Sequence, residues 1–132
     1  MLKFAKNIAV CVCLLPVTGF SLGLGELDLH SSLNQPLDAD VELLVTEKID
    51  LEQIRVALGV AEDFTRSGID RPFFLTKFQF EILTKADGSA FVRITSKEVI
   101  KEPFIDFILE VTWPSGRLLR EYTMLLDPPV FV

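Results

Sequence analysis

The stretch "FIDFILEVTWPSGRLLREYTMLL", residues 104–126, has two runs of alternating apolar residues on either side of a short Pro-Ser-Gly tip. Period-two alternation is typical of a strand with one buried face. In the first run the residues that share this face are Ile105, Phe107, Leu109, Val111 and Trp113. Pro114, Ser115 and Gly116 are turn formers, so the second run is expected to fold back on the first. The stretch predicts an antiparallel β-hairpin.

The same alternation recurs toward the N-terminus. It is present in "GELDLHSSL" (25–33), "LDADVELLV" (37–45), "TKFQFEIL" (76–83) and "FVRITS" (91–96). The last two segments flank Asp87-Gly88, a dipeptide suited to the positive backbone angles of a tight hairpin. We therefore expect six strands, with a seventh, weaker one near Val99.

The middle of the sequence has a helical pattern instead. Residues 51–58 carry apolar side chains at helical spacing behind Asp50, a good N-cap residue. Residues 61–68 offer a second short helical turn, which Gly68 would close. Strands without repeated crossover helices favour a mainly β fold. The sequence predicts an antiparallel immunoglobulin-like β-sandwich with one or two short helices between the second and third strands.

The N-terminus has the build of a secretory signal peptide over residues 1–21. A basic start precedes a short apolar block, residues 8–17, and small residues lead to a predicted cleavage after Ser21. Cleavage after Gly23 and retention as an uncleaved anchor are the alternatives. The block is shorter than the roughly 20 residues of a membrane span. We expect a periplasmic protein with no membrane span in the mature chain.

Removal of this segment changes the composition of the mature chain. Both cysteines, Cys11 and Cys13, lie within it, so the folded domain would depend on its hydrophobic core rather than on disulfides. Losing Lys3 and Lys6 from 13 basic residues leaves 11 against 19 acidic ones. Such an acidic surface argues against nucleic acid as a partner.

Few residues suggest chemistry. His30, the single histidine, falls on the polar side of a strand, and the serines form no Gly-x-Ser-x-Gly motif. Asp38, Asp40 and Glu42 line one strand face, where a solvated surface is favoured over a weak cation site because a straight strand cannot wrap a metal. We expect no catalytic residue, no metal site and no cofactor.

The hairpin tip is the candidate partner-binding site. Tryptophan, tyrosine and arginine dominate interface hot spots, but Trp113 alternates with core residues and is expected to pack inward. The arginines beside the turn are expected to be freer to meet a partner. The candidate residues are Pro114, Ser115, Gly116, Arg117 and Arg120.

Three blocks resemble one known family in the same order. They are "LGLGELDLHSSLNQPLDADVELL" (22–44), "EDFTRSGIDRP" (62–72) and "EPFIDFILEVTWPSGRLLREYTMLLDPP" (102–129), and they resemble the N-terminal periplasmic region of FimV-type proteins. The resemblance implies a non-enzymatic interaction domain that supports type IV pilus and secretin assembly, twitching motility and localisation at the cell pole. It also implies pilus or secretin assembly proteins as partners.

The resemblance also bears on domain organisation. In that family the domain precedes a LysM peptidoglycan-binding module, a membrane span and a cytoplasmic tail. We expect a domain over residues 22–129 and the start of a linker or tail at 130–132, so a fragment of a longer scaffold and a free-standing protein both stay open. The alternative function is a carbohydrate-binding module that contacts peptidoglycan directly.

Overall fold

Seven strands make up most of the structure, a computed structural model that describes residues 22–45 and 50–128. The strands are β1 (Leu22–Leu29), β2 (Pro36–Val45), β3 (Arg55–Leu58), β4 (Gln79–Thr84), β5 (Ala90–Val99), β6 (Phe104–Trp113) and β7 (Gly116–Leu125). The predicted signal peptide, residues 1–21, and the predicted linker, residues 130–132, lie outside the described residues. In the described ranges no helix is long and apolar enough to cross a membrane.

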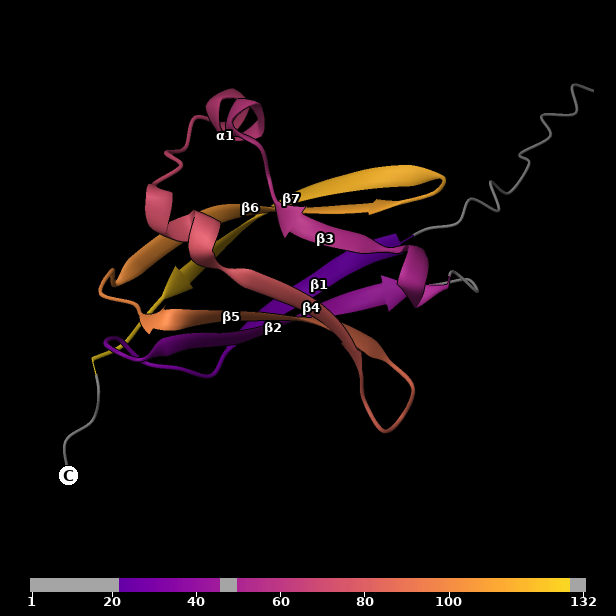
Figure 1. Cartoon of the computed structure of the whole chain (residues 1–132), viewed down its shortest axis with the longest axis horizontal. Coiled ribbons are helices and arrows are strands. Elements are labelled where there is room, and N and C mark those ends of the chain that lie inside the picture. Colours follow the sequence, from indigo (N-terminus) through magenta and orange to yellow (C-terminus); the bar gives the residue numbers. More distant parts are fainter. Residues whose placement is uncertain (1–21, 46–49, 129–132) are drawn as a thin grey trace, which may run out of the picture.

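The strands form two antiparallel sheets packed face to face (Figure 1). One sheet has the order β1-β2-β5-β4 and the other has the order β3-β6-β7. This is the strand order of a seven-stranded immunoglobulin constant-type domain, in which the first, second, fifth and fourth strands face the third, sixth and seventh. The predicted immunoglobulin-like sandwich is confirmed.

The core lies between the two sheets and consists of the alternating residues that the sequence placed inward. Side chains of β2, β5 and β6 are excluded from solvent most completely, among them Val41, Val92, Phe107 and Leu109, each 0% exposed. The Phe107 ring packs edge-on against Phe78, with centroids 6.1 Å apart, and lies 6.0 Å from the Tyr122 ring. This aromatic cluster joins β6 to β7 and to Phe78, the residue before β4, and it packs the core without the disulfide that antibody domains have.

The prediction of a helix over residues 51–58 is wrong. The structure has a single 3-10 turn, η1 (Leu51–Gln53), followed directly by β3. Asp50 does cap this turn, because its carboxylate accepts a hydrogen bond from the Glu52 N–H at 3.0 Å. Beyond it, Val56 and Leu58 pair with Val111 and Leu109 of β6. Pairing with a buried strand outweighs the local helical spacing of so short a segment.

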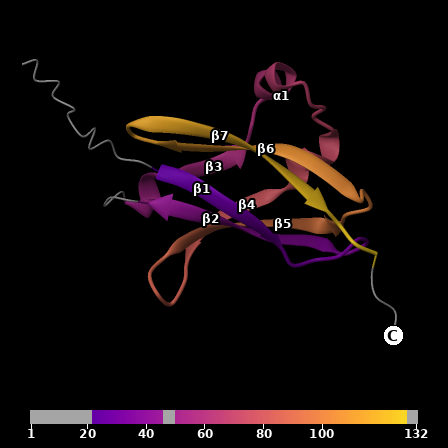
Figure 2. The ribbon, with the colours of Figure 1, turned by 180° about the vertical axis from the view of Figure 1, so that it is seen from behind.

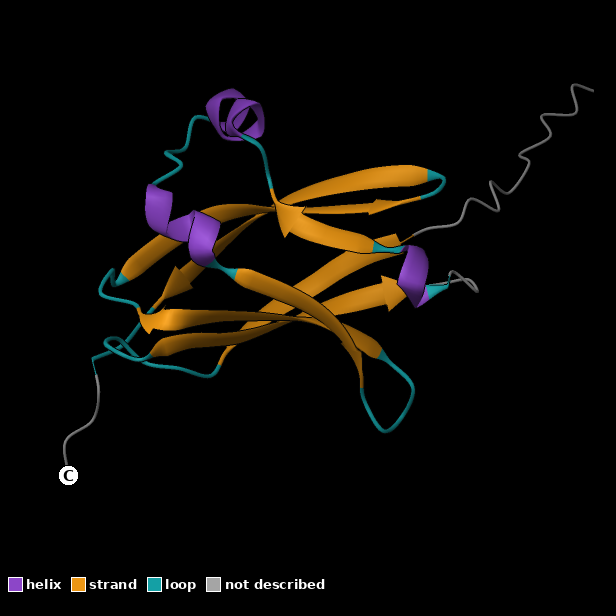
Figure 3. Cartoon of the chain, in the orientation of Figure 1, coloured by secondary structure: helices purple, strands orange, loops and turns teal. Residues whose placement is uncertain are grey.

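The second helical turn, predicted over residues 61–68, is present. The helix α1 (Ala61–Ser67) and the 3-10 helix η2 (Phe73–Lys77) both fall between β3 and β4. Gly68 closes α1 as expected, with a φ of 74° that suits glycine. Figure 3 shows α1 above the β3-β6-β7 sheet and η2 on the path from α1 toward β4. Strand β3 was not predicted from the sequence. Val99 ends β5 instead of forming a strand of its own.

Candidate interaction surfaces

The β6–β7 hairpin turns at Pro114 and Ser115, which are both exposed. Trp113 is half-buried and packs against the core, as its alternation predicts. Its indole also lies over Gly116, where an added Cβ would come within 2.5 Å of the ring carbon Cζ2. Only glycine fits under the ring, so the tip has a fixed shape and presents two small side chains to solvent.

Arg117 is bonded within the domain. Its Nη2 lies 2.7 Å from Oε2 of Glu110 and 3.0 Å from Oδ2 of Asp63, and its Nε donates to Glu110 at 3.1 Å. Asp63 belongs to α1 and is only 4% exposed. Hydrogen bonding to Glu110, reinforced by the charges of both carboxylates, raises the pKa of Arg117. The guanidinium thus fastens α1 to the outer face of the β3-β6-β7 sheet.

Arg120 and Tyr122 join the two sheets at one side. Arg120 donates to the carbonyl of Leu24 and lies 5.0 Å from the centre of the Tyr122 ring. The Tyr122 hydroxyl donates to the carbonyl of Gly25 at 2.7 Å, and burial raises its pKa. Figure 2 shows β7 and β1 next to each other on this side.

A bulge in β1 makes these contacts possible. Gly25 and Glu26 together stand opposite Glu42 of β2, because the register shifts between Leu24 and Leu27. A bulge bends a strand and turns its carbonyls away from the regular ladder. A Cβ at Gly25 would approach Glu42 Cβ to 2.9 Å, so the bulge requires glycine. Both arginines are exposed, and each is also bonded to another part of the domain, so their contact with a partner stays a prediction.

The polar face of β2 has a simple arrangement. His30 is exposed and its Nε2 lies 2.8 Å from Oδ2 of Asp40, while Asp38 lies 3.5 Å from Nε of Arg93. Within residues 22–45 and 50–128, no group of three or more histidine, cysteine or acidic side chains is placed to hold a metal. The face carries scattered ion pairs of the kind found on solvated strands.

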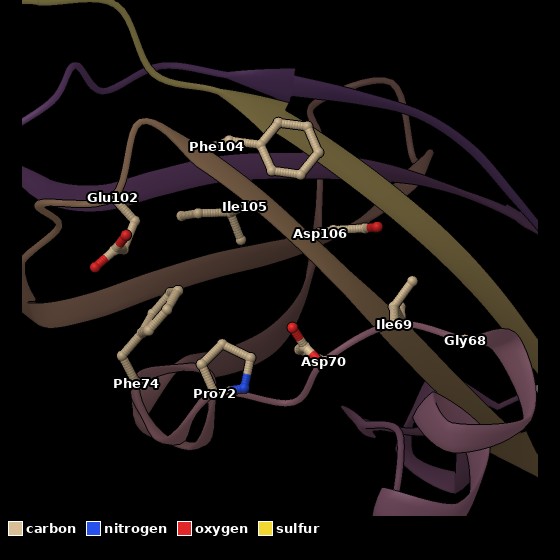
Figure 4. Close-up of a pocket in the computed structure, with 9 residues that line it drawn as sticks. All are labelled: Gly68, Ile69, Asp70, Pro72, Phe74, Glu102, Phe104, Ile105 and Asp106. Carbon is tan, nitrogen blue, oxygen red and sulfur yellow. The ribbon is translucent and has the colours of Figure 1, made fainter.

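A groove that the sequence did not predict lies at the other end of β6 (Figure 4). It has a volume of about 480 Å³ and runs between the α1–η2 connection and the first residues of β6. Its lining residues are Gly68, Ile69, Asp70, Pro72, Phe74, Glu102, Phe104, Ile105 and Asp106. Apolar walls and three carboxylates occur together here. The signal in the sequence was Phe104, an apolar residue on the outward phase of its strand.

The comparisons with known proteins agree with this fold. The profile of a family described as FimV N-terminal domain Ig-like domain matches residues 22–129. Over 126 residues the chain is 43% identical to the motility hub protein FimV of Pseudomonas aeruginosa strain PAO1, covering 96% of this chain and 14% of that protein. The same protein of strain UCBPP-PA14 gives the same values. The chain spans about one seventh of the length of these relatives.

One solved structure is also similar, the BIgI domain of beta protein from S. agalactiae bound to CEACAM1. It has a TM-score of 0.42 and 13% sequence identity, and the match covers 83% of this chain and 97% of that one. The family match, by contrast, extends over almost every described residue, and the Ig-like fold in the family's description agrees with the strand order of the structure. The chain belongs to the FimV N-terminal domain family.

Proposed function

We propose that the chain is a non-enzymatic protein-interaction domain that supports type IV pilus and secretin assembly and twitching motility. The observation that carries the proposal is the 43% identity to a motility hub protein over 126 residues. A hub acts by contacting other proteins, and an immunoglobulin-like sandwich offers rigid loops and strand edges for that purpose. The single histidine is exposed beside the polar face of β2, where its ring Nε2 lies 2.8 Å from Oδ2 of Asp40.

We place the domain in the periplasm. The support is the signal-peptide pattern of residues 1–21, with its basic start, short apolar block and small residues before Ser21. Protection of the chain from protease in intact cells, compared with its digestion in spheroplasts, whose outer membrane is opened, measures the location. Digestion only after lysis of the inner membrane would contradict it.

The proposed contact is the tip of the β6–β7 hairpin. Pro114 and Ser115 are its exposed residues, and Gly116 holds the turn under Trp113. Arg117 and Arg120 act there chiefly by fixing the base of the hairpin, through Asp63 and the Leu24 carbonyl. A small, rigid tip loses little conformational entropy when it binds.

Site-specific photocrosslinking in living cells tests both parts of the proposal. A crosslinkable residue at Ser115 is compared with one at Ala86, which is also an exposed turn residue, in the β4–β5 hairpin. We expect an adduct with a pilus or secretin assembly protein at Ser115 and none at Ala86. Adducts at neither position, together with normal twitching when residues 22–129 are deleted from the gene, would refute the function. Adducts at Ala86 alone, with twitching lost on deletion, would refute only the contact site.

Direct binding to peptidoglycan is the alternative. Carbohydrate-binding modules stack exposed aromatic rings on sugars, whereas Trp113 is half-buried and Tyr122 is 7% exposed with its hydroxyl bonded to Gly25. Sedimentation of the purified protein with peptidoglycan decides between the two functions. Co-sedimentation that persists in high salt would favour the carbohydrate function.

A further inference from the structure

The groove beside β6 occupies the place where β3 would have continued. In β3, Ala57 pairs with Glu110, and the Gly59 N–H then donates to the Ile108 carbonyl at 2.8 Å. After Gly59 the chain leaves the sheet to form α1. The first residues of β6 therefore have β7 on one side and no strand on the other.

The alternation of an antiparallel ladder shows which backbone groups of β6 point toward its unpaired edge. Ile108 and Glu110 direct their backbone groups toward β3, so Phe104 and Asp106, at the same parity, direct theirs the same way. The opposite parity faces β7, because Trp113 and Gly116 close the hairpin and the Leu126 N–H bonds the Pro103 carbonyl at 2.8 Å. The N–H and C=O groups of Phe104 and Asp106 thus point toward the groove. No described residue supplies a backbone partner for them on that side.

The walls of the groove match an extended, partly apolar segment. Phe104 is 57% exposed, and its cross-strand neighbour Leu125 is 66% exposed. Phe74 and Glu102 line both this groove and a second hollow beside it, which Val99, 45% exposed, also lines. Exposed apolar side chains at two adjoining hollows, with Leu125 beside Phe104 on β7, are typical of an interaction site.

The charge of the groove is negative. Three of its lining residues, Asp70, Glu102 and Asp106, are acidic and none is basic. None of these carboxylates is in a salt bridge within the described part of the chain. The neighbouring hollow adds Glu98, which pairs with Lys77, and the exposed Lys101. The groove itself is therefore complementary to a cation.

Asp106 is the one of the three groove carboxylates with a buried, unpartnered oxygen among the described residues. This oxygen is its Oδ1. A hydrogen bond with Asp106 raises the pKa of Glu121, and desolvation and the Asp106 charge act in the same direction. A buried carboxylate oxygen without a donor carries a desolvation cost that a cationic donor would remove.

We propose that the groove binds an extended segment of a partner protein, which adds as a strand to Phe104–Asp106 of β6 and directs a lysine or arginine toward Asp70, Glu102 and Asp106. Strand addition gains affinity from backbone hydrogen bonds and specificity from pockets for alternate side chains. Apolar residues alternating with basic ones fit this geometry, because successive side chains of a strand point to opposite faces. This surface lies at the opposite end of β6 from the hairpin tip (Figure 1), and the inference does not depend on the cellular role proposed above.

A peptide titration of the isotopically labelled full chain tests this proposal. The probe is an acetylated octapeptide of alternating valine and lysine, and the matched control replaces every lysine with glutamate. We expect shift changes at Phe104 and Asp106 with the lysine peptide only, and amide hydrogen exchange at these two residues slowed at least about tenfold as they enter a ladder. A lysine peptide N-methylated at alternate residues should bind more weakly, since its backbone cannot donate.

Two variants with the same change of charge distinguish binding of the lysine peptide in the groove from its general electrostatic attraction to an acidic protein. Asp106→Asn is expected to weaken binding of the lysine peptide by roughly tenfold, the effect of one charge-assisted hydrogen bond. Asp28→Asn removes an exposed carboxylate from β1 and is expected to change the affinity by less than about twofold. Absence of binding at millimolar peptide, equal binding of the glutamate peptide, equal effects of the two variants, or unchanged amide exchange at Phe104 and Asp106 would each overturn the proposal.

Discussion

Arg117→Ala is expected to destabilise the domain by about 2 kcal/mol, because it leaves the Asp63 carboxylate without its closest cation. Asp63 is 4% exposed, and its Oδ2 lies 3.0 Å from Arg117 Nη2. Loss of one partner of a fully buried pair costs roughly 3–5 kcal/mol. The Arg117 side chain is 48% exposed, however, so water can reach the carboxylate after truncation. Asp63 also keeps the Val60 N–H at 3.3 Å, and the cost should therefore fall below that range.

Urea unfolding followed by the fluorescence of Trp113, the single tryptophan, measures this change. Arg66→Ala is the matched control, because Arg66 Nη1 lies 3.5 Å from Asp63 Oδ1 but its side chain is 70% exposed. We expect this control to cost at most about 0.5 kcal/mol. Adding Asp63→Asn to Arg117→Ala removes the stranded charge and should restore about half of the lost stability.

Equal effects of Arg117→Ala and Arg66→Ala, or no recovery with Asp63→Asn, would refute the reasoning. The result also affects the choice of variants in binding experiments. If Arg117→Ala loosens α1, a loss of partner capture by this variant does not identify Arg117 as a contact. Substitutions at Ser115 leave the base of the hairpin intact and are the sharper probes.

Three further predictions follow from single contacts. Gly116→Ala should cost about 1–3 kcal/mol and shift the Trp113 emission, because the new Cβ meets the ring at 2.5 Å; an unchanged emission spectrum would contradict it. Tyr122→Phe should cost about 1 kcal/mol through the lost bond to Gly25, and a cost near zero in urea unfolding would mean that this bond does not hold β1. Glu121→Gln should stabilise the fold at neutral pH by up to about 1 kcal/mol. The pKa of Glu121 in the folded protein is raised above 4.5, so the charged carboxylate destabilises the wild-type fold above that folded pKa. This destabilisation fades as the pH falls toward 4.5. A stability difference between the two proteins that does not shrink on acidification would refute the interaction of Glu121 with Asp106.

Much of the fold was accessible from alternation alone. The inward residues of β2, β5 and β6 are the most buried in the domain, because period-two burial is imposed locally by the pleat of each strand. The β4–β5 turn was also predicted, although only Gly88 of the Asp87-Gly88 pair has a positive φ, at 89°. Strand β3 was missed, since four residues carry too little pattern to distinguish a strand from a helix.

The candidate sites were less accessible. The arginines beside the hairpin look free in the sequence, but their partners lie 54 residues away at Asp63 and 96 residues away at Leu24. Ile108 and Phe104 are both apolar residues at positions of β6 that should point away from the core. Ile108 is nevertheless 3% exposed, whereas Phe104 is 57% exposed. Ile108 lies next to Phe64 of α1 where the chain passes Gly59, whereas nothing in the described chain covers Phe104 to a similar extent.

The sequence by itself determined the strand periods, the turn positions, the lack of cysteine in residues 22–129 and the family, because these depend on residues close together in the chain or on their order. Only the tertiary structure decided which edges are paired and which charges are neutralised. The early exit of β3 at Gly59 leaves one edge of β6 unpaired at its first residues, and the folding of α1 back over the sheet engages Arg117. Both outcomes depend on contacts between distant segments, which no local pattern encodes.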